Sequence, residues 1–164
     1  PVGSECVDVN YCYVSSPIGR LLLSGHDGLL CYVGLPDGKA RISPQQDWQQ
    51  VEDGFPSVTQ QLKEYFSGQR ETFSVAFLPA GTDFQLYVWS ALREIPYGQT
   101  WTYAQIAEMI GRPLAVRAVG AANGANPLPI LVPCHRVIGA NGSLTGFAGG
   151  LAAKSYLLGL ESAK

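Results

Sequence analysis

The sequence has 164 residues, 46% of them hydrophobic, with a formal net charge of −2 and a pI near 5.6. This length fits one domain or two small ones, and the composition supplies enough apolar side chains for a core. The negative net charge excludes a protein that binds nucleic acid by bulk positive charge alone. The charge is uneven, however: residues 1–83 hold 5 basic and 10 acidic residues, net −5, and residues 84–164 hold 6 and 3, net +3. We therefore expect a polyanionic partner to bind the second half.

Location and redox state follow from two absences in the sequence. No apolar run reaches the roughly 20 residues of a membrane-spanning helix, and the first residues lack the basic start and apolar stretch of a signal peptide. We expect no membrane partner and a cytosolic protein, or a nuclear one in a eukaryote. In a reducing compartment, free or catalytic thiols are expected rather than disulfides at Cys6, Cys12, Cys31 and Cys134. The first three could bind a structural zinc with His26, but no C-x-x-C pair is present and ordinary buried thiols are expected instead.

The first half has the pattern of an antiparallel sheet. Three strand-forming runs, separated by the turn sequences SPIG and HDG, lie at residues 9–14, 20–24 and 29–34. After a polar stretch at residues 38–54, we expect a helix over residues 58–66 that Gly68 ends, and a further strand over residues 72–77.

The linker candidate LPAGT, residues 78–82, divides this half from a part with helical periodicity. The predicted fold class is α+β. An N-terminal β-rich domain with a helix is expected over residues 1–80, and a mainly helical C-terminal domain with a helix-turn-helix over residues 81–164.

Two helices are expected at the start of the second half. The first has Asp83 as its N-cap and is stopped by Pro96 and Gly98. The second begins at Thr102 and ends at Gly111, and the turn GRP follows it.

A third helix, in LAVRAVGAANGAN, has a bare surface on which Arg117, Gly120, Ala121 and Gly124 share one side. Each glycine weakens a helix by up to about 1 kcal/mol, so this face suggests that a partner approaches its backbone closely. Two helices joined by a glycine turn, with one arginine on the bare face, resemble a DNA-binding helix-turn-helix. The alternative is tight packing of that face inside a core, against which the long charged Arg117 argues.

A single cysteine of the second half, Cys134, lies in NPLPILVPCHRVIG, where prolines stiffen the backbone and ILV directs it inward. With an ordinary pKa of about 8.5, the thiol needs a base or a cation before it can attack. His135 is the candidate base, but neighbours in extended backbone point to opposite sides, so direct pairing would need a sharp turn, and we expect a bridging water molecule instead. Glu161 is expected to orient the histidine, since Glu94 and Glu108 fall on helix surfaces.

Three kinds of chemistry remain open for this thiol. A cysteine hydrolase usually has its histidine far away in sequence and needs an oxyanion hole, which the sequence does not reveal. A metal site needs more ligands than Cys134 and His135 supply. The third is alkyl or acyl transfer to the thiol, and the adjoining helix-turn-helix would make the substrate nucleic acid.

The segment NPLPILVPCHRVIG, with RAVGAANGANP before it and TGFAGGLAAKSYLLGLE after it, closely resembles the O6-alkylguanine-DNA alkyltransferases, or methylated-DNA–protein-cysteine methyltransferases. FQLYVWSALREIPYGQTWTYAQIA is similar to the family's preceding segment, so the resemblance covers residues 84–161 nearly without gaps. SSPIGRLLLSG resembles the family's N-terminal strands more loosely.

The resemblance implies that the helix-turn-helix binds double-stranded DNA through the minor groove and that the damaged guanine is flipped out of the stack. Arg117 matches the arginine that fills the vacated stack, and Ala121 and Gly124 lie on the same DNA-binding face. Tyr103 matches the tyrosine that crowds the neighbouring phosphate and hydrogen-bonds the flipped base. Asn126 matches the asparagine that ties the recognition helix to the active-site loop.

The resemblance also implies the reaction. Cys134 attacks the alkyl carbon of O6-alkylguanine, or of O4-alkylthymine, in an in-line displacement. His135, held by Glu161, takes the thiol proton through a water molecule, and Tyr103 donates a proton toward the leaving guanine. The thioether formed is too stable to be reversed by any residue identified, so each molecule is expected to act once.

Further residues of the base pocket are implied in the same way. The backbone around Cys134 and Val137 is expected to accept from the exocyclic amine of guanine, beside Pro133, and the loop at residues 146–150 to close the pocket. Where some members have a serine, this chain has Ala148, so a hydroxyl contact to the guanine oxygen is lost. We expect no cofactor. Some members bind zinc in their N-terminal domain, but this chain does not supply a full set of zinc ligands there.

The strongest rival is a non-catalytic protein of the alkyltransferase-like kind, which binds alkylated guanine and recruits other repair factors. Those relatives lack the reactive cysteine, and this chain has Cys134. A methylation-sensing transcription factor would need a further DNA-binding domain, which we do not expect in 164 residues. We therefore predict a monomeric DNA repair protein, with cooperative binding on DNA left open.

Overall fold

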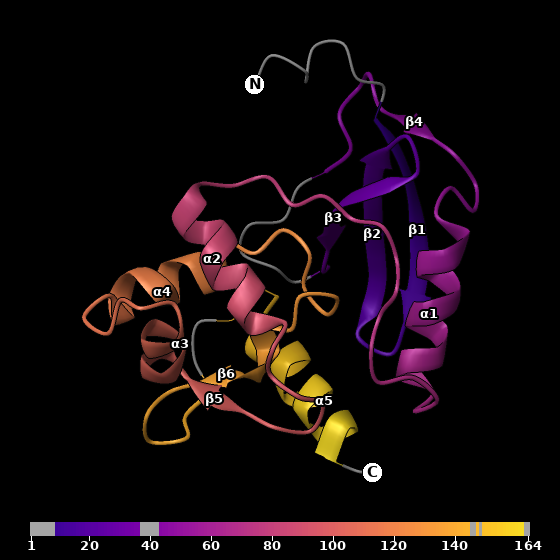
Figure 1. The fold of residues 1–164 in the computed structure, drawn as a ribbon. Coiled ribbons are helices and arrows are strands. Elements are labelled where there is room, and N and C mark those ends of the chain that lie inside the picture. Colours follow the sequence, from indigo (N-terminus) through magenta and orange to yellow (C-terminus); the bar gives the residue numbers. More distant parts are fainter. Residues whose placement is uncertain (1–8, 37–42, 145–146, 148, 163–164) are drawn as a thin grey trace.

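The computed structural model describes residues 9–36, 43–144, 147 and 149–162, and its architecture is α+β (Figure 1). A small sheet with helix α1 beside it forms the N-terminal part, and the remaining helices gather on one side of that sheet. The predicted fold class is therefore confirmed.

The N-terminal sheet has the strand order β3-β2-β1-β4. Strands β1 (Asn10–Ser16), β2 (Gly19–His26) and β3 (Leu29–Gly34) form the predicted antiparallel meander. Strand β4 (Gln49–Gln50) pairs parallel with β1 at the edge. Sequence analysis missed β4 because two exposed glutamines carry no apolar alternation.

One face of this sheet belongs to the core. Its inward side chains alternate along the three strands as period-2 geometry requires, and they are Cys12, Val14, Leu21, Leu23 and Val33. Helix α1 (Pro56–Phe66) lies alongside and contributes further buried side chains. The same cluster of buried residues continues into the C-terminal helices, so the two parts share one core.

The strand predicted over residues 72–77 is wrong. The segment makes a single bridge, between Leu30 and Phe77, rather than a ladder. Its alternating apolar side chains are nevertheless packed against the core, and they are Phe73, Val75 and Phe77. The alternation therefore reflects the burial of one side of an extended segment, and this segment does not pair continuously with a strand.

The C-terminal part begins with helices α2 (Asp83–Leu92) and α3 (Tyr103–Met109), each with a capping box. The predicted N-cap Asp83 is wrong by one residue: the Thr82 hydroxyl accepts from the N–H of Gln85, and the Gln85 side chain accepts from the N–H of Thr82. An aspartate can cap a helix, but a capping box satisfies two unpaired N–H groups at once, which favours threonine here.

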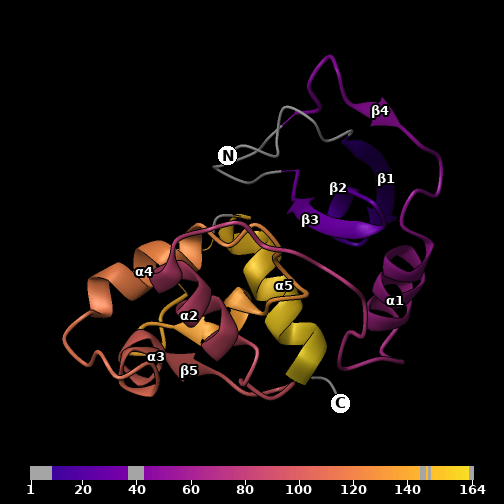
Figure 2. The same cartoon turned by 45° about the horizontal axis from the view of Figure 1, so that its top comes forward.

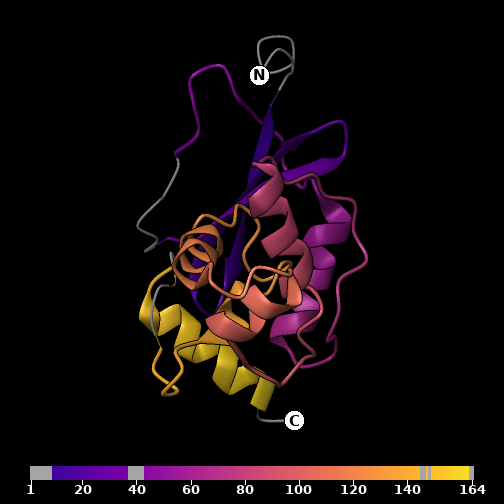
Figure 3. The same ribbon diagram turned by 60° about the vertical axis from the view of Figure 1, so that its left-hand side comes forward.

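Helices α3 and α4 (Val116–Gly124) are joined by a turn in which Gly111 adopts φ +77°, the left-handed region that glycine favours. Together they form the predicted helix-turn-helix, which Figure 3 shows in front of the sheet beside α2. Short strands β5 (Trp101–Thr102) and β6 (Val137–Ile138) pair in parallel below it. The last helix, α5 (Leu151–Ser162), lies on the side of this part nearest α1 (Figure 2).

The bare face of α4 lies on the surface, so the alternative that it packs inside the core is wrong. Arg117 and Ala121 are exposed, while Val119 and Ala122 on the opposite side are buried. A Cβ atom placed on Gly120 would meet only the Tyr103 ring, at 3.9 Å, which is an ordinary contact. Packing within the protein therefore does not require a glycine there.

Within the residues that the structure describes, no helix is long and apolar enough to cross a membrane.

The capping box of α3 gives a first prediction. Replacing Thr102 by alanine removes the acceptor for the Gln105 N–H, so we expect the free energy of unfolding to fall by about 0.5–2 kcal/mol. Chemical denaturation measures this change. The matched control is Thr100→Ala, two residues earlier and exposed, which should change stability by less than about 0.5 kcal/mol. Equal stability of the two variants would contradict the capping role.

Candidate active site

The thiol lies in a tight turn rather than in extended backbone. Residues Cys134–Arg136 form the 3-10 helix η2, with the Cys134 N–H donating to the Val132 carbonyl at 2.7 Å. Pro133 precedes the turn at φ −79°, a value that the proline ring fixes. The expectation of extended backbone at Cys134 is therefore wrong. The turn directs three consecutive side chains, Cys134, His135 and Arg136, into the interior, where all are buried.

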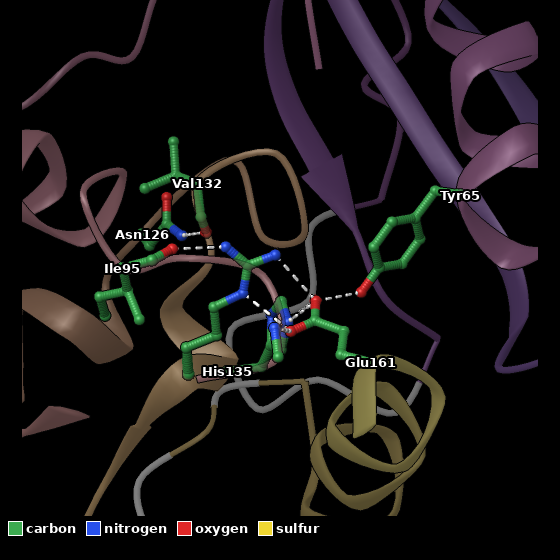
Figure 4. A network of polar contacts seen from close by, with 8 residues as sticks. Tyr65, Ile95, Asn126, Val132, His135 and Glu161 are labelled. Carbon is green, nitrogen blue, oxygen red and sulfur yellow. Dashed lines mark hydrogen bonds and ion pairs between the residues drawn. The ribbon is translucent and has the colours of Figure 1, made fainter. Parts of the chain in front are cut away.

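A buried carboxylate from α5 is the centre of the site (Figure 4). His135 Nε2 lies 2.7 Å from Glu161 Oε2, which makes Glu161 the acidic neighbour that sequence analysis selected. Arg136 binds the same carboxylate with two nitrogens, Nε to Oε1 at 2.8 Å and Nη2 to Oε2 at 2.9 Å. Two parallel N–H···O bonds of this kind hold the carboxylate on the side facing Arg136.

Two further donors complete the surroundings of Glu161. The Tyr65 hydroxyl donates to Oε2 at 2.6 Å, and the Gly98 N–H points at Oε1 from 3.5 Å. Arg136 is itself held by the carbonyl oxygen of Ile95, 2.7 Å from Nη1. Burial acts to raise the pKa of Glu161, but the hydrogen bonds from His135 and Arg136 outweigh it and lower the pKa to about 2. The carboxylate is therefore charged at neutral pH.

The protonation of His135 follows from these contacts. Burial lowers its pKa, and the hydrogen bond and charge of Glu161 oppose this only in part, so the ring is neutral at neutral pH. Because Nε2 faces a carboxylate, we assign the single proton to Nε2. Nδ1 is then an acceptor. It is buried and has no hydrogen-bond partner among the described residues, which leaves it available to receive a proton.

The Cys134 thiol is protonated at rest. Burial raises its pKa to about 11, and the Asn126 side chain and the Lys154 charge offset this only partly. His135 Nδ1 does not bond the thiol directly within the described structure, and the water bridge between the two stays a prediction. At rest the site therefore contains a protonated thiol at Cys134 and a neutral imidazole at His135.

Asn126 connects helix α4 to the active-site turn. It follows α4 directly; its Nδ2 donates to the Val132 carbonyl at 2.8 Å, and its Oδ1 accepts from the Leu128 N–H at 3.0 Å. Asn123, on α4 itself, adds a 3.4 Å contact from Nδ2 to the Cys134 carbonyl. These bonds couple the position of the recognition helix to that of the thiol.

Sequence analysis missed Lys154, which is fully buried on α5. Its Nζ donates to the Val137 carbonyl at 2.6 Å, and its charge acts to lower the pKa of Cys134. A signal was present in the sequence: Lys154, Leu157 and Glu161 recur at intervals of 3 and 4 and so share one helix face. Charged residues at core-facing positions are rare unless they are paired or functional.

The remaining predicted residues lie either on the helix-turn-helix or in the predicted closing loop. Tyr103, Arg117, Ala121 and Gly124 lie on the helix-turn-helix, where Tyr103 starts α3 immediately after β5. Strand β5 pairs with β6, which follows the thiol turn and contains Val137, so the start of the helix-turn-helix adjoins the active site. These residues do not contact the Glu161 carboxylate in the described structure.

Ala148 and residue 146 of the predicted closing loop lie outside the described residues. Within that loop Phe147 and Gly149 are buried, and Gly149 lies against Leu35 of the N-terminal part. The first part of the chain therefore supports the loop beside the site.

The sequence offered Cys6, Cys12, Cys31 and His26 as possible zinc ligands, although ordinary buried thiols were expected there. Within the described residues no group of three or more histidine, cysteine or acidic side chains could hold a metal ion. Cys12 is buried in β1, Cys31 is half-buried in β3, and both are free thiols. Cys6 lies outside the described residues.

Fold and site together define a class: an α+β protein in which a surface helix-turn-helix adjoins a buried thiol that is followed by a buried histidine bound to a carboxylate. The family model described as "6-O-methylguanine DNA methyltransferase, DNA binding domain" matches residues 83–163, and the one described as "6-O-methylguanine DNA methyltransferase, ribonuclease-like domain" matches residues 9–79. The chain belongs to the 6-O-methylguanine DNA methyltransferase family.

Similar proteins agree with this family along nearly the whole chain. A methylated-DNA–protein-cysteine methyltransferase of Methanosarcina acetivorans is 52% identical over 151 residues, which are 92% of this chain and 97% of that protein. One of Mycobacterium tuberculosis is 46% identical over 156 residues, 95% and 94% of the two chains. The crystal structure of Mycobacterium tuberculosis OGT in complex with DNA is similar at a TM-score of 0.89 and 45% identity, covering 94% of this chain and 93% of that one.

The charge of Glu161 gives a second prediction. Glu161→Gln leaves Arg136 buried without its counter-charge, so we expect a loss of about 3–5 kcal/mol in the free energy of unfolding at pH 7. The Glu161 pKa is about 2 in the folded protein and near 4.5 when unperturbed, so its stabilisation is complete above pH 4.5 and is lost as pH falls toward 2. Urea denaturation across this range should show the gap between wild type and variant closing.

The matched control for this variant is Glu94→Gln, an exposed carboxylate in the same part of the chain. It should change stability by less than about 0.5 kcal/mol at every pH. A gap between wild type and Glu161→Gln that stays constant from pH 7 to pH 2 would contradict a charged Glu161.

Proposed function

We propose that this protein repairs DNA by direct reversal. It transfers the alkyl group of O6-alkylguanine, and of O4-alkylthymine, in duplex DNA to Cys134, irreversibly and once per molecule. The observation that carries the proposal is a buried, protonated thiol next in sequence to a histidine whose Nε2 is bound to Glu161 and whose Nδ1 has no hydrogen-bond partner within the described residues. Membership of the family and the names of its members support the same reaction.

The chemistry follows from the protonation states. As the alkyl carbon approaches, the proton of Cys134 passes through a water molecule to Nδ1 of His135, and the Glu161 carboxylate stabilises the imidazolium that forms. The sulfur forms a bond to the carbon while the bond from that carbon to O6 breaks. Tyr103 supplies a proton to the departing guanine, so restored guanine and a thioether on Cys134 are the products.

Lys154 supports the formation of the thiolate. Its buried positive charge lies near enough to Cys134 to favour the thiolate over the thiol. Its bond to the Val137 carbonyl also fixes an acceptor for the exocyclic amine of guanine, since a carbonyl oxygen has two lone pairs. Pro133 holds the start of this turn, and the pocket beside it would be closed by the loop that contains Ala148.

DNA binding is proposed to use the helix-turn-helix through the minor groove. The bare face of α4 would lie against the DNA with Ala121 and Gly124, and Arg117 would enter the stack that the flipped guanine leaves. Tyr103 adjoins this face, next to Gly120, so it would meet the phosphate beside the lesion. The net +3 of residues 84–164 favours a polyanion on this side, and the similar Mycobacterium tuberculosis OGT has a crystal structure in complex with DNA. We propose that the protein acts as a monomer in the cytoplasm, or in the nucleus of a eukaryote.

A non-catalytic lesion-binding protein is the second candidate function. It would need the same helix-turn-helix but no nucleophile. The complete arrangement of Cys134, His135 and Glu161 favours transfer, because a buried charged network is costly to maintain for binding alone.

Removal of the nucleophile separates these two functions. Cys134→Ala should abolish transfer of a labelled methyl group from an O6-methylguanine duplex while duplex affinity stays within about twofold, because the docking surface is untouched. The matched control is Cys31→Ala, which removes a free thiol far from the turn in sequence and should transfer at the wild-type rate. Transfer that survives in Cys134→Ala would contradict the proposal.

The stack-filling role of Arg117 gives a separate prediction. Arg117→Ala should weaken duplex binding and slow transfer from duplex DNA by about tenfold, the order expected for one lost arginine contact (~1–3 kcal/mol). With a free O6-alkylguanine base no stack has to be filled, so the rate should equal that of wild type. Equal slowing on both substrates would mean that Arg117 supports the fold or the thiol instead.

A further inference from the structure

One residue of the active-site network comes from the N-terminal half of the chain. Tyr65, near the end of α1, lies 96 positions before Glu161 in sequence, yet its hydroxyl donates to Glu161 Oε2 at 2.6 Å. Both side chains are buried, with Tyr65 fully inaccessible. Figure 4 shows the Tyr65 ring reaching the carboxylate from the side opposite the Asn126 and Val132 pair.

The N-terminal core fixes the position of the Tyr65 ring. Phe66 lies edge-on at 5.3 Å between ring centroids, and Phe73 is tilted at 5.5 Å. Tyr97, from the segment after α2, completes the contact at 6.3 Å. The hydroxyl is therefore held in place by rings from both halves of the chain, and Arg136 of the thiol turn lies over one of them, Tyr97, at 5.6 Å from its centroid.

Glu161 Oε2 accepts from three donors, and Tyr65 differs from the other two. His135 gains a proton at Nδ1 in the proposed reaction and becomes charged, and Arg136 carries a permanent charge. Burial, and then the negative charge of Glu161, raise the pKa of Tyr65, so its hydroxyl is a neutral donor at neutral pH. A neutral donor shares the carboxylate's negative charge without competing for the proton.

We propose that Tyr65 is a positioning residue for alkyl transfer: its hydroxyl fixes the rotation of the Glu161 carboxylate and limits how strongly that carboxylate holds a proton on His135. This inference rests on the proposed function of Cys134 and His135. It means that the N-terminal half completes the active site by supplying one of its hydrogen bonds.

The direction of the effect on His135 can be worked out. Without the Tyr65 hydroxyl, the carboxylate directs more of its charge toward His135, which favours the imidazolium and raises the His135 pKa. A base with a raised pKa is already protonated, and so unable to accept the thiol proton, up to a higher pH. Transfer would therefore be lost at a higher pH as the solution is acidified. The carboxylate can also rotate away from His135, which lowers the rate where the base is neutral.

The variant that tests this is Tyr65→Phe, which removes the hydroxyl and keeps the ring packing. Single-turnover transfer from an O6-methylguanine duplex would be measured from pH 5 to pH 9. We expect the plateau rate to fall by about tenfold, as for other hydrogen-bond partners one contact removed from a reacting group. The midpoint of the acidic limb should rise by roughly half a unit.

A packing control separates this role from a structural one. Phe73→Leu loosens the packing against the Tyr65 ring and leaves the hydroxyl in place. It should lower the melting temperature at least as much as Tyr65→Phe does, yet keep the wild-type midpoint of the acidic limb. A shifted midpoint in Phe73→Leu, or an unshifted one in Tyr65→Phe, would overturn the proposal.

A second readout does not depend on transfer. The chain has two histidines, so in a His26→Asn background one imidazole remains and NMR can follow its titration. The His135 pKa should be higher in Tyr65→Phe than in its parent, and equal values overturn the inference while leaving the proposed function intact. A wild-type protein that transfers nothing but still shows the NMR difference would refute the proposed function, and with it the role of Tyr65 in transfer, while its contact with Glu161 stands.

Discussion

The burial of one carboxylate, Glu161, is the constraint on which the rest of the structure depends. A charge removed from water is tolerated only when donors replace its hydration. Here the donors come from distant parts of the sequence: a hydroxyl from α1, the backbone of Gly98, and two side chains of the thiol turn, His135 and Arg136. Folding of the N-terminal sheet, the C-terminal helices and the active site therefore converges on one interaction.

The same burial explains the resting chemistry of the site. Dehydration keeps Cys134 as a thiol and His135 as a neutral imidazole, while hydrogen bonds keep Glu161 ionised. A thiol that is protonated at rest is protected from oxidation and from adventitious electrophiles, since the thiolate is the reactive form. The nucleophile would form only when a substrate carbon and a bridging water are in place, which suits a protein that can react once.

Much of this arrangement could be predicted because the signals were local. The alternation of apolar residues located the meander, and helical periodicity with Gly111 located the helix-turn-helix. Glu161 was selected by elimination, because the second half has only three acidic residues and the other two lie on helix surfaces. The family resemblance supplied roles that no periodicity could give to Arg117 or Asn126.

Of the features that were missed, one is a local turn and the others depend on contacts between segments far apart in sequence. The 3-10 turn at Cys134 differs from extended backbone by a few hydrogen bonds that proline-rich sequence does not announce. The alternation at residues 72–77 reported burial correctly but could not report whether a neighbouring strand was within reach. Tyr65 reads as an ordinary core aromatic on α1, and only the assembled fold places its hydroxyl on Glu161.

The central claim is that Cys134 becomes alkylated once by a lesion in DNA. The most direct measurement mixes the protein with a short duplex carrying one O6-methylguanine, weighs the intact protein by mass spectrometry and maps its peptides. The account predicts a gain of one methyl group, on Cys134, that saturates at one per molecule even with excess duplex. An unmodified protein, or a methyl group on any other residue, would contradict it.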